Sequence, residues 1–161
     1  MKAFYISSLA VLCCLLTLGA CKHVPIGYLE TRDANFAPDT IYAYRVVNPE
    51  SIRAKTGAPW TSLRIQGISG TNPINYEFKD VKAKEGGDAD KFRQAVASGD
   101  ILVVGGIVQV FPKAVEQLTN GIYTLTLRVF NEGHSAILSD IITFVVADKE
   151  PESVDIAIPE D

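Results

Sequence analysis

The sequence predicts a mainly β protein in which two antiparallel sheets pack as a sandwich, with one short helix. Short apolar segments rich in β-branched and aromatic residues recur along the chain, separated by glycine and proline turns. Residues 120–131 alternate most clearly. Because strand side chains alternate between two faces, one face of this segment is apolar. That face comprises Tyr123, Leu125, Leu127 and Val129. About seven such strands indicate a sandwich.

The amino terminus predicts a secretory signal. Met1-Lys2 gives a positive start, residues 3–18 are almost wholly apolar, and Leu18-Gly19-Ala20-Cys21 ends the run. The apolar run is too short for a membrane-spanning helix. We therefore expect residues 1–20 to be removed.

Leu18-Gly19-Ala20-Cys21 resembles the lipobox of bacterial lipoproteins. The resemblance implies cleavage before Cys21 and lipidation of that cysteine, so that the membrane is a partner through the anchor. No aspartate follows Cys21, which by the same resemblance implies the outer membrane, on the cell surface or the periplasmic face. A plain signal peptide with an incidental cysteine is the alternative.

Removal of the signal leaves 141 of the 161 residues, enough for one domain. Cys13 and Cys14 lie in the signal, so the mature chain has neither a free thiol nor a disulfide. The formal charge changes from −4 to −5, which argues against nucleic acid as a partner. We expect a tether over 21–38, the domain over 39–148 and an acidic tail or edge strand over 149–161.

The first half of the domain contains three predicted strands: residues 41–47, 63–68 and 74–78. Asn48-Pro49 breaks the first strand, and residues 51–56 fit a helical turn. Turn residues separate the second strand from the third.

The second half opens with the predicted helix, residues 88–98, capped by Asp88 or Asp90 and stopped by Gly99. Residues 101–111 are apolar enough to be buried, and Gly105-Gly106 indicates a bulge or bend within them. After residues 120–131, a turn at 132–134 leads to the partner strand, residues 137–146. Its inner face is predicted to hold Leu138, Ile142, Phe144 and Val146.

The end of the chain contains one more alternating segment, residues 153–158. Val154, Ile156 and Ile158 share one face between proline-bounded acidic residues. A frayed terminus is one interpretation. The other is an edge strand added to this sandwich or to that of a partner.

Tyr123 stands at the start of its strand, two residues before an inward position. In immunoglobulin-like sandwiches a tyrosine there closes the preceding corner with its hydroxyl. The inward position is Leu125 rather than cysteine. The predicted sandwich is therefore immunoglobulin-like.

Residues 120–146 resemble the last hairpin of PKD-like and other immunoglobulin-like extracellular modules. The matching residues are Gly121, Tyr123, Leu125, Leu127, Val129, Asn131, Phe144 and Val146. With the lipobox, the whole chain resembles small surface lipoproteins of Bacteroidota, some of which accompany starch-utilisation-type glycan uptake systems. The resemblance implies no catalytic residues and no cofactor.

Catalytic motifs are not found in the sequence. His23 lies beside the anchor, and His134 lies in a predicted turn where Ser135 points away from it. Asp88 and Asp90 resemble part of a calcium loop, but Phe92 occupies a position that needs an oxygen ligand. We expect the aspartates to cap a helix and the protein to hold no metal.

The candidate ligand-stacking residues are Trp60, Tyr42 and Tyr44. Trp60 is the only tryptophan, and the two tyrosines share one face of their strand. An aromatic face can stack on a sugar, although core packing is the alternative for all three.

The sequence therefore favours a non-catalytic binding or assembly role in the envelope, with an envelope protein or a glycan as partner and glycan uptake as a candidate setting. A fimbria-like structural subunit that exchanges strands is the alternative. A small hydrolase is a third class, and it would need two carboxylates about 5 to 10 Å apart in a cleft.

Overall fold

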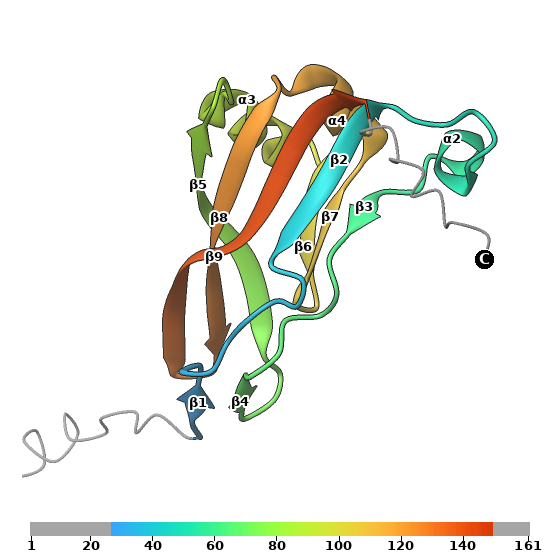
Figure 1. Ribbon diagram of the computed structural model, residues 1–161. Helices are drawn as coiled ribbons and strands as arrows, with labels where there is room; N and C mark the ends of the chain where they lie inside the picture. The colour runs from blue at the N-terminus through green and yellow to red at the C-terminus, as the bar shows by residue number, and fades with distance from the viewer. Residues whose placement is uncertain (1–26, 150–161) are drawn as a thin grey trace, which may run out of the picture.

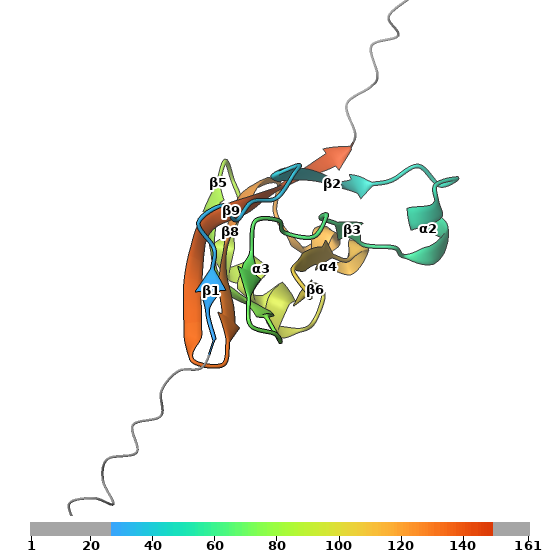
Figure 2. The same cartoon turned by 90° about the horizontal axis from the view of Figure 1, so that it is seen from below.

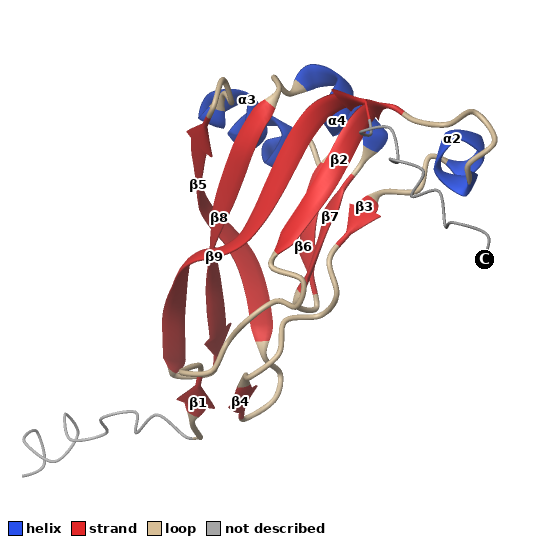
Figure 3. Ribbon diagram, viewed as in Figure 1, coloured by secondary structure: helices blue, strands red, loops and turns tan. Residues whose placement is uncertain are grey.

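The computed structural model describes residues 27–149 (Figure 1). Cys21, His23 and the segment 153–158 lie outside them, as do the predicted signal and most of the acidic tail. The described residues are mainly strands, as predicted, and they include three short helices (Figure 3). The elements are β1 (Leu29–Glu30), β2 (Thr40–Val46), α2 (Ile52–Thr56), β3 (Trp60–Thr61), β4 (Ser69–Gly70), β5 (Asn75–Lys84), α3 (Ala89–Ala97), β6 (Ile101–Val104), β7 (Ile107–Val110), α4 (Pro112–Gln117), β8 (Gly121–Asn131) and β9 (His134–Lys149).

The large sheet has the strand order β2-β9-β8-β5. β8 pairs antiparallel with both of its neighbours, whereas β2 pairs parallel with β9. The sheet is therefore mixed, and the prediction of purely antiparallel pairing is wrong for β2. Nearly the whole domain separates these two strands in the chain, so no local turn sets their relative direction.

The small sheet has the order β3-β7-β6 and is antiparallel throughout. It lies behind the large sheet, and the second view shows the two layers apart (Figure 2). Gly105 and Gly106 both have positive φ and form the two-residue turn of the β6–β7 hairpin. The predicted bend within one buried segment is therefore a complete reversal of the chain, which the glycine pair makes sterically easy.

The core lies between the sheets, and β8 and β9 supply much of it. Tyr123, Leu125, Leu127 and Val129 are all buried, as the alternation predicts. The inner positions of β9 are confirmed as well: Leu138, Ile142, Phe144 and Val146. Phe92 from α3 is also buried and stacks against both Tyr123 and Phe78.

The large sheet bends halfway along β8. The pairing register shifts next to Thr126 in both neighbouring strands. In β5 the shift lies between Phe78 and Asp80. In β9 it lies between Leu138 and Ile142, the partners of Leu127 and Leu125. Figure 1 shows the lower parts of β8 and β9 turned away from the upper parts. Because bulges increase local twist, these two irregularities account for the bend.

Three helices lie within residues 27–149 where one was predicted. α3 is the predicted helix, and its cap is Asp88, whose side chain accepts hydrogen bonds from the N–H groups of Asp90 and Lys91. α2 is the predicted helical turn. α4 was missed, because Pro112 was interpreted only as the end of a strand, whereas proline is also favoured in the first helical turn.

The predicted strand over residues 63–68 is wrong. This segment is a loop between β3 and β4 that makes only scattered backbone bonds: the Ile65 N–H donates to Gly106 O (2.8 Å), and Gln66 and Asn35 form an isolated bridge. Ile65 is buried and Leu63 is exposed. The alternation of apolar and polar residues here comes from a loop that packs one side against the core. Periodicity alone cannot distinguish such a loop from a β-strand.

The second half of the predicted tether is folded onto the domain. β1 pairs with β4, and Phe36 is buried in the core. The isolated bridge at Asn35 fixes the same segment to the 63–68 loop. Described structure therefore begins before residue 39, where the sequence placed the start of the domain.

Candidate functional site

Two adjacent hollows lie at the end of the sandwich that carries α2 and α4. One, the apolar groove, is lined by Gly57, Gly99, Asp100, Leu102, Phe111, Pro112 and Lys113. The other, the arginine pocket, is lined by Tyr44, Arg45, Val47, Arg53, Ala54, Gly57, Trp60, Pro112 and Glu116. Gly57 and Pro112 belong to both, so the two hollows share one border.

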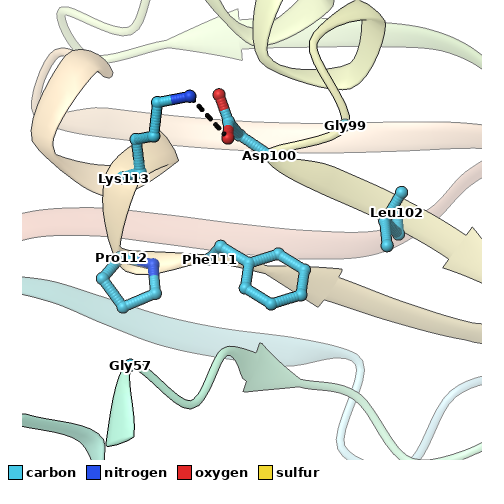
Figure 4. A pocket seen from close by; sticks show the side chains of 7 residues that line it. All are labelled: Gly57, Gly99, Asp100, Leu102, Phe111, Pro112 and Lys113. Carbon is cyan, nitrogen blue, oxygen red and sulfur yellow. Dashed lines mark hydrogen bonds and ion pairs between the residues drawn. The ribbon is translucent and has the colours of Figure 1, made fainter.

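The apolar groove has a volume of about 420 Å³. Figure 4 shows Phe111, Pro112 and Leu102 along it, with Asp100 and Lys113 at one side. The Lys113 Nζ lies 3.0 Å from Asp100 Oδ1, and the Ser98 hydroxyl donates to Asp100 Oδ2 at 2.7 Å. Both interactions lower the pKa of the Asp100 carboxyl, and the hydrogen bond from Ser98 has the larger effect. The groove is therefore an apolar surface with an ion pair on its rim.

The arginine pocket has a volume of about 260 Å³, and α2 forms one wall of it. The Ser51 hydroxyl caps this helix by accepting from the Ala54 N–H at 3.1 Å. At the other end Gly57 adopts a left-handed conformation and its N–H donates to Arg53 O at 2.8 Å. A single helical turn, capped at both ends, thus presents Arg53 to the pocket.

Arg53 is the unusual side chain of this pocket. Its guanidinium carbon lies 4.4 Å from the centroid of the Trp60 ring, which is a cation–π contact. Its Nε is buried and has no hydrogen-bond partner. Arg53 takes part in none of the ion pairs found among residues 27–149. A guanidinium without an anionic partner is therefore one wall of this pocket, and its buried Nε is a costly unpaired donor.

Arg45, the second arginine of the pocket, has hydrogen-bond partners at both of its terminal nitrogens. Its Nη1 donates to Asn120 Oδ1 (2.8 Å) and to the carboxylate of Asp148, and its Nη2 donates to Leu118 O (2.7 Å). These bonds join β2 to the segment before β8 and to the end of β9. Arg45 therefore has a structural role in the wall of the pocket.

The predicted stacking residues are separated by the structure. Trp60 is 5% exposed and Arg53 covers one face of its ring, so that face is closed to a ligand. Tyr44 is half-buried and lines the arginine pocket, while Tyr42 is 56% exposed on the outer face of the large sheet and lines neither hollow. The structure thus brings Tyr44 and Trp60 together with Arg53 and leaves Tyr42 apart.

The other polar candidates have local roles. Asp88 caps α3, and Asp90 pairs with Arg93 at 2.7 Å, which agrees with the capping interpretation. His134 begins β9 opposite Asn131, so the turn comprises only residues 132 and 133. In the described part of the chain, no group of three histidine, cysteine, aspartate or glutamate residues is placed to hold a metal ion.

Sequence reasoning missed Arg53, Arg45 and Glu116 as pocket residues. The only signal near Arg53 is the helical turn expected over residues 51–56, which indicates the local backbone but does not say what the side chain faces. Trp60 and Arg53 meet because the Arg53 side chain reaches from α2 to the ring in β3, and that is a tertiary contact.

Comparison with known protein families, with curated proteins and with solved structures finds no match. Among residues 27–149, none of the helices has the length and apolar character needed to cross a membrane.

Proposed function

We propose that this protein is a lipid-anchored envelope protein with a non-catalytic binding role, and that the arginine pocket is its binding site. The observation that carries the proposal is the Arg53 guanidinium, which lines a pocket of about 260 Å³ and takes part in none of the ion pairs among residues 27–149. Binding pockets characteristically combine an apolar and aromatic wall with a few placed polar groups. Trp60, Tyr44 and Pro112 supply the wall, and Arg53 supplies the polar group.

The domain is proposed to be immunoglobulin-like. Taken in chain order, β3, β5, β6, β7, β8 and β9 correspond to strands B to G, and the orders β5-β8-β9 and β3-β7-β6 match the C-F-G and B-E-D arrangements of that fold. The Tyr123 hydroxyl donates to Thr119 O at 2.8 Å, as a tyrosine corner requires. β2 departs from the constant-type pattern, because it joins the C-F-G sheet.

The lipid anchor rests on the lipobox residues, Leu18 to Cys21, and the outer-membrane location rests on the lack of an aspartate directly after Cys21. In the native host, Cys21→Ser should move the protein from the membrane fraction or leave the signal uncleaved. Fractionation followed by intact-mass analysis checks this. A mature protein with an unmodified Cys21 would contradict the proposal.

A glycan is the proposed ligand class, in the setting of an uptake complex, because Tyr44 and Trp60 line the pocket together with the cationic group. Affinity electrophoresis in gels containing envelope and dietary polysaccharides tests this. Tyr44→Ala should abolish any retardation of the chain, and Tyr28→Ala is the matched control, since Tyr28 is 57% exposed and lines neither hollow. Equal retardation of both variants would remove the pocket from the binding role.

The fimbria-like alternative is supported by one observation: among residues 27–149, β2 lies at the edge of the large sheet. Its neighbour on one side is β9, and Tyr42 and Val46 are exposed. A strand from another chain could be added there. Sedimentation of the mature chain separates the two roles, because a strand-exchanging subunit forms dimers or polymers and a binding module does not.

The hydrolase alternative gains no support from the two hollows. Each has a single carboxylate in its lining, Asp100 in the groove and Glu116 in the pocket. A general acid also needs a raised pKa, whereas the bonds to Asp100 lower its pKa.

A further inference from the structure

We propose that the arginine pocket takes a carboxylate group, held by the guanidinium of Arg53. This inference rests on the proposed function of the pocket and names the chemistry of its ligand. Three observations carry it: the state of the Arg53 side chain, the charges around it, and the acidic sequence that follows β9.

The Arg53 guanidinium is held in place before any ligand arrives. The Trp60 ring lies against one face at 4.4 Å, and a capped helical turn fixes the backbone. Arg53 takes part in none of the ion pairs of the described residues. Its Nε is covered by protein atoms, so a carboxylate would place its two oxygens against the two terminal nitrogens, in the plane of the guanidinium fork.

The charges of the pocket fit one negative charge. Arg45 and Arg53 line it together with Glu116. Asp148 already neutralises Arg45, so Arg53 is the cation that remains for a ligand. Glu116 in the wall would repel the second charge of a phosphate or sulfate dianion. A carboxylate, with a single charge, is therefore favoured over either.

Two sources could supply this carboxylate. One is the chain itself. Residues 150–161 contain five acidic side chains and no lysine or arginine. β9 ends at Lys149, which lies opposite Val46 of β2. Val47, the residue that follows β2, lines the pocket. The acidic residues therefore follow directly after a strand end that lies close to the pocket. The other source is a free ligand, such as a sugar that carries a carboxylate.

The test follows the Arg53 Nε–H group directly by nitrogen-15 NMR in the mature chain with Cys21→Ser. Sodium glucuronate and sodium acetate are titrated, with glucose as the neutral control and sodium sulfate as the alternative anion. We expect a saturable shift of the Arg53 signal with the two carboxylates and none with glucose. Arg53→Lys should weaken glucuronate binding at least about tenfold, because the ammonium cannot form the planar two-bond contact. Arg32→Lys is the matched control, since the Arg32 side chain is 82% exposed.

The second arm identifies the source. Glu150→Gln, Glu152→Gln and Asp155→Asn are combined in the full-length chain. If the chain supplies the carboxylate, the Arg53 signal moves in this variant without any ligand, and acetate then binds more tightly than to the parent chain. If the ligand is free, the variant behaves as the parent does. Both results support the inference.

Two results would overturn it. One is an Arg53 signal that responds neither to the carboxylates nor to neutralisation of the acidic residues. The other is tighter binding of sulfate than of glucuronate. Either can occur while Tyr44→Ala still abolishes polysaccharide retardation, in which case the proposed function stands and the carboxylate assignment fails.

Discussion

The Tyr123 hydroxyl connects three segments of the chain at the start of β8. It accepts a hydrogen bond from the Asp88 N–H (3.1 Å) and donates one to Thr119 O (2.8 Å). Its ring is fully buried and stacks on Phe92 at 5.2 Å between centroids. The residue thus fixes the corner before β8 and the amino end of α3 at the same time.

Tyr123→Phe should lower the free energy of unfolding by about 2 kcal/mol, because two hydrogen bonds of the hydroxyl are lost and each contributes about 1 kcal/mol net. Tyr123→Ala should lower it by about 3 to 5 kcal/mol, because it also opens a cavity beside Phe92. Urea unfolding measures both, and Tyr42→Phe is the control on an exposed ring. Equal and small effects at Tyr123 would show that the corner is misplaced.

Asp100 should make stability depend on acidity. Its pKa is lowered in the folded protein by the Ser98 hydroxyl and by Lys113. The folded state therefore binds fewer protons than the unfolded chain near the ordinary aspartate pKa of about 4, so the stabilisation is present above that pH and declines as pH falls through the lower folded value. Asp100→Asn should flatten the loss of stability on acidification, measured as melting temperature from pH 7 to pH 3. A parent-like slope in the variant would exclude this contribution.

At the scale of elements, Gly67 determines the backbone path of the 63–68 loop. The alternation of apolar and polar residues in this segment does not predict that path. Gly67 has φ +71°, and a Cβ there would lie 1.9 Å from the backbone oxygen of Asp33. The close approach holds the amino-terminal segment against the loop, next to the bridge between Asn35 and Gln66. An extended strand would lose this contact.

Gly67→Ala should therefore cost about 3 kcal/mol of stability or more, since backbone must move to relieve the overlap. Gly99→Ala is the matched control. Gly99 has φ +81° but open space around it, so it should show only the left-handed strain of about 1 kcal/mol. Chemical denaturation of the two variants measures the difference, and similar costs would mean that the Asp33 contact is not kept in solution.

At the scale of the whole molecule, the buried side chains of both sheets form one continuous core. Trp60 lies in β3 of the small sheet, whereas most of the strand residues belong to the large sheet. Because Trp60 is the only tryptophan, its fluorescence reports on the surroundings of β3, at one edge of the small sheet.

We expect unfolding in one cooperative transition, because neither sheet can bury its inner face without the other. Tryptophan fluorescence and far-ultraviolet circular dichroism should then give the same midpoint in urea. Phe92→Ala, which removes the ring that stacks on Phe78 and Tyr123, should shift both midpoints together. An earlier fluorescence transition would show that the small sheet opens separately.

The sequence by itself determined the mainly β class, the faces of β8 and β9, the corner at Tyr123 and the helix capped by Asp88. Each depends on a local cause: a period of two, a residue at a strand start, or a side chain that caps the next turn. Only the tertiary structure decided the parallel pairing of β2 with β9, the bend at Thr126 and the loop path of residues 63–68. It also decided the arginine pocket, where Tyr44, Arg53 and Trp60 come from three separate elements. The physical reason is the same in each case, because contacts between distant segments depend on which surfaces remain to be buried once the local elements have formed.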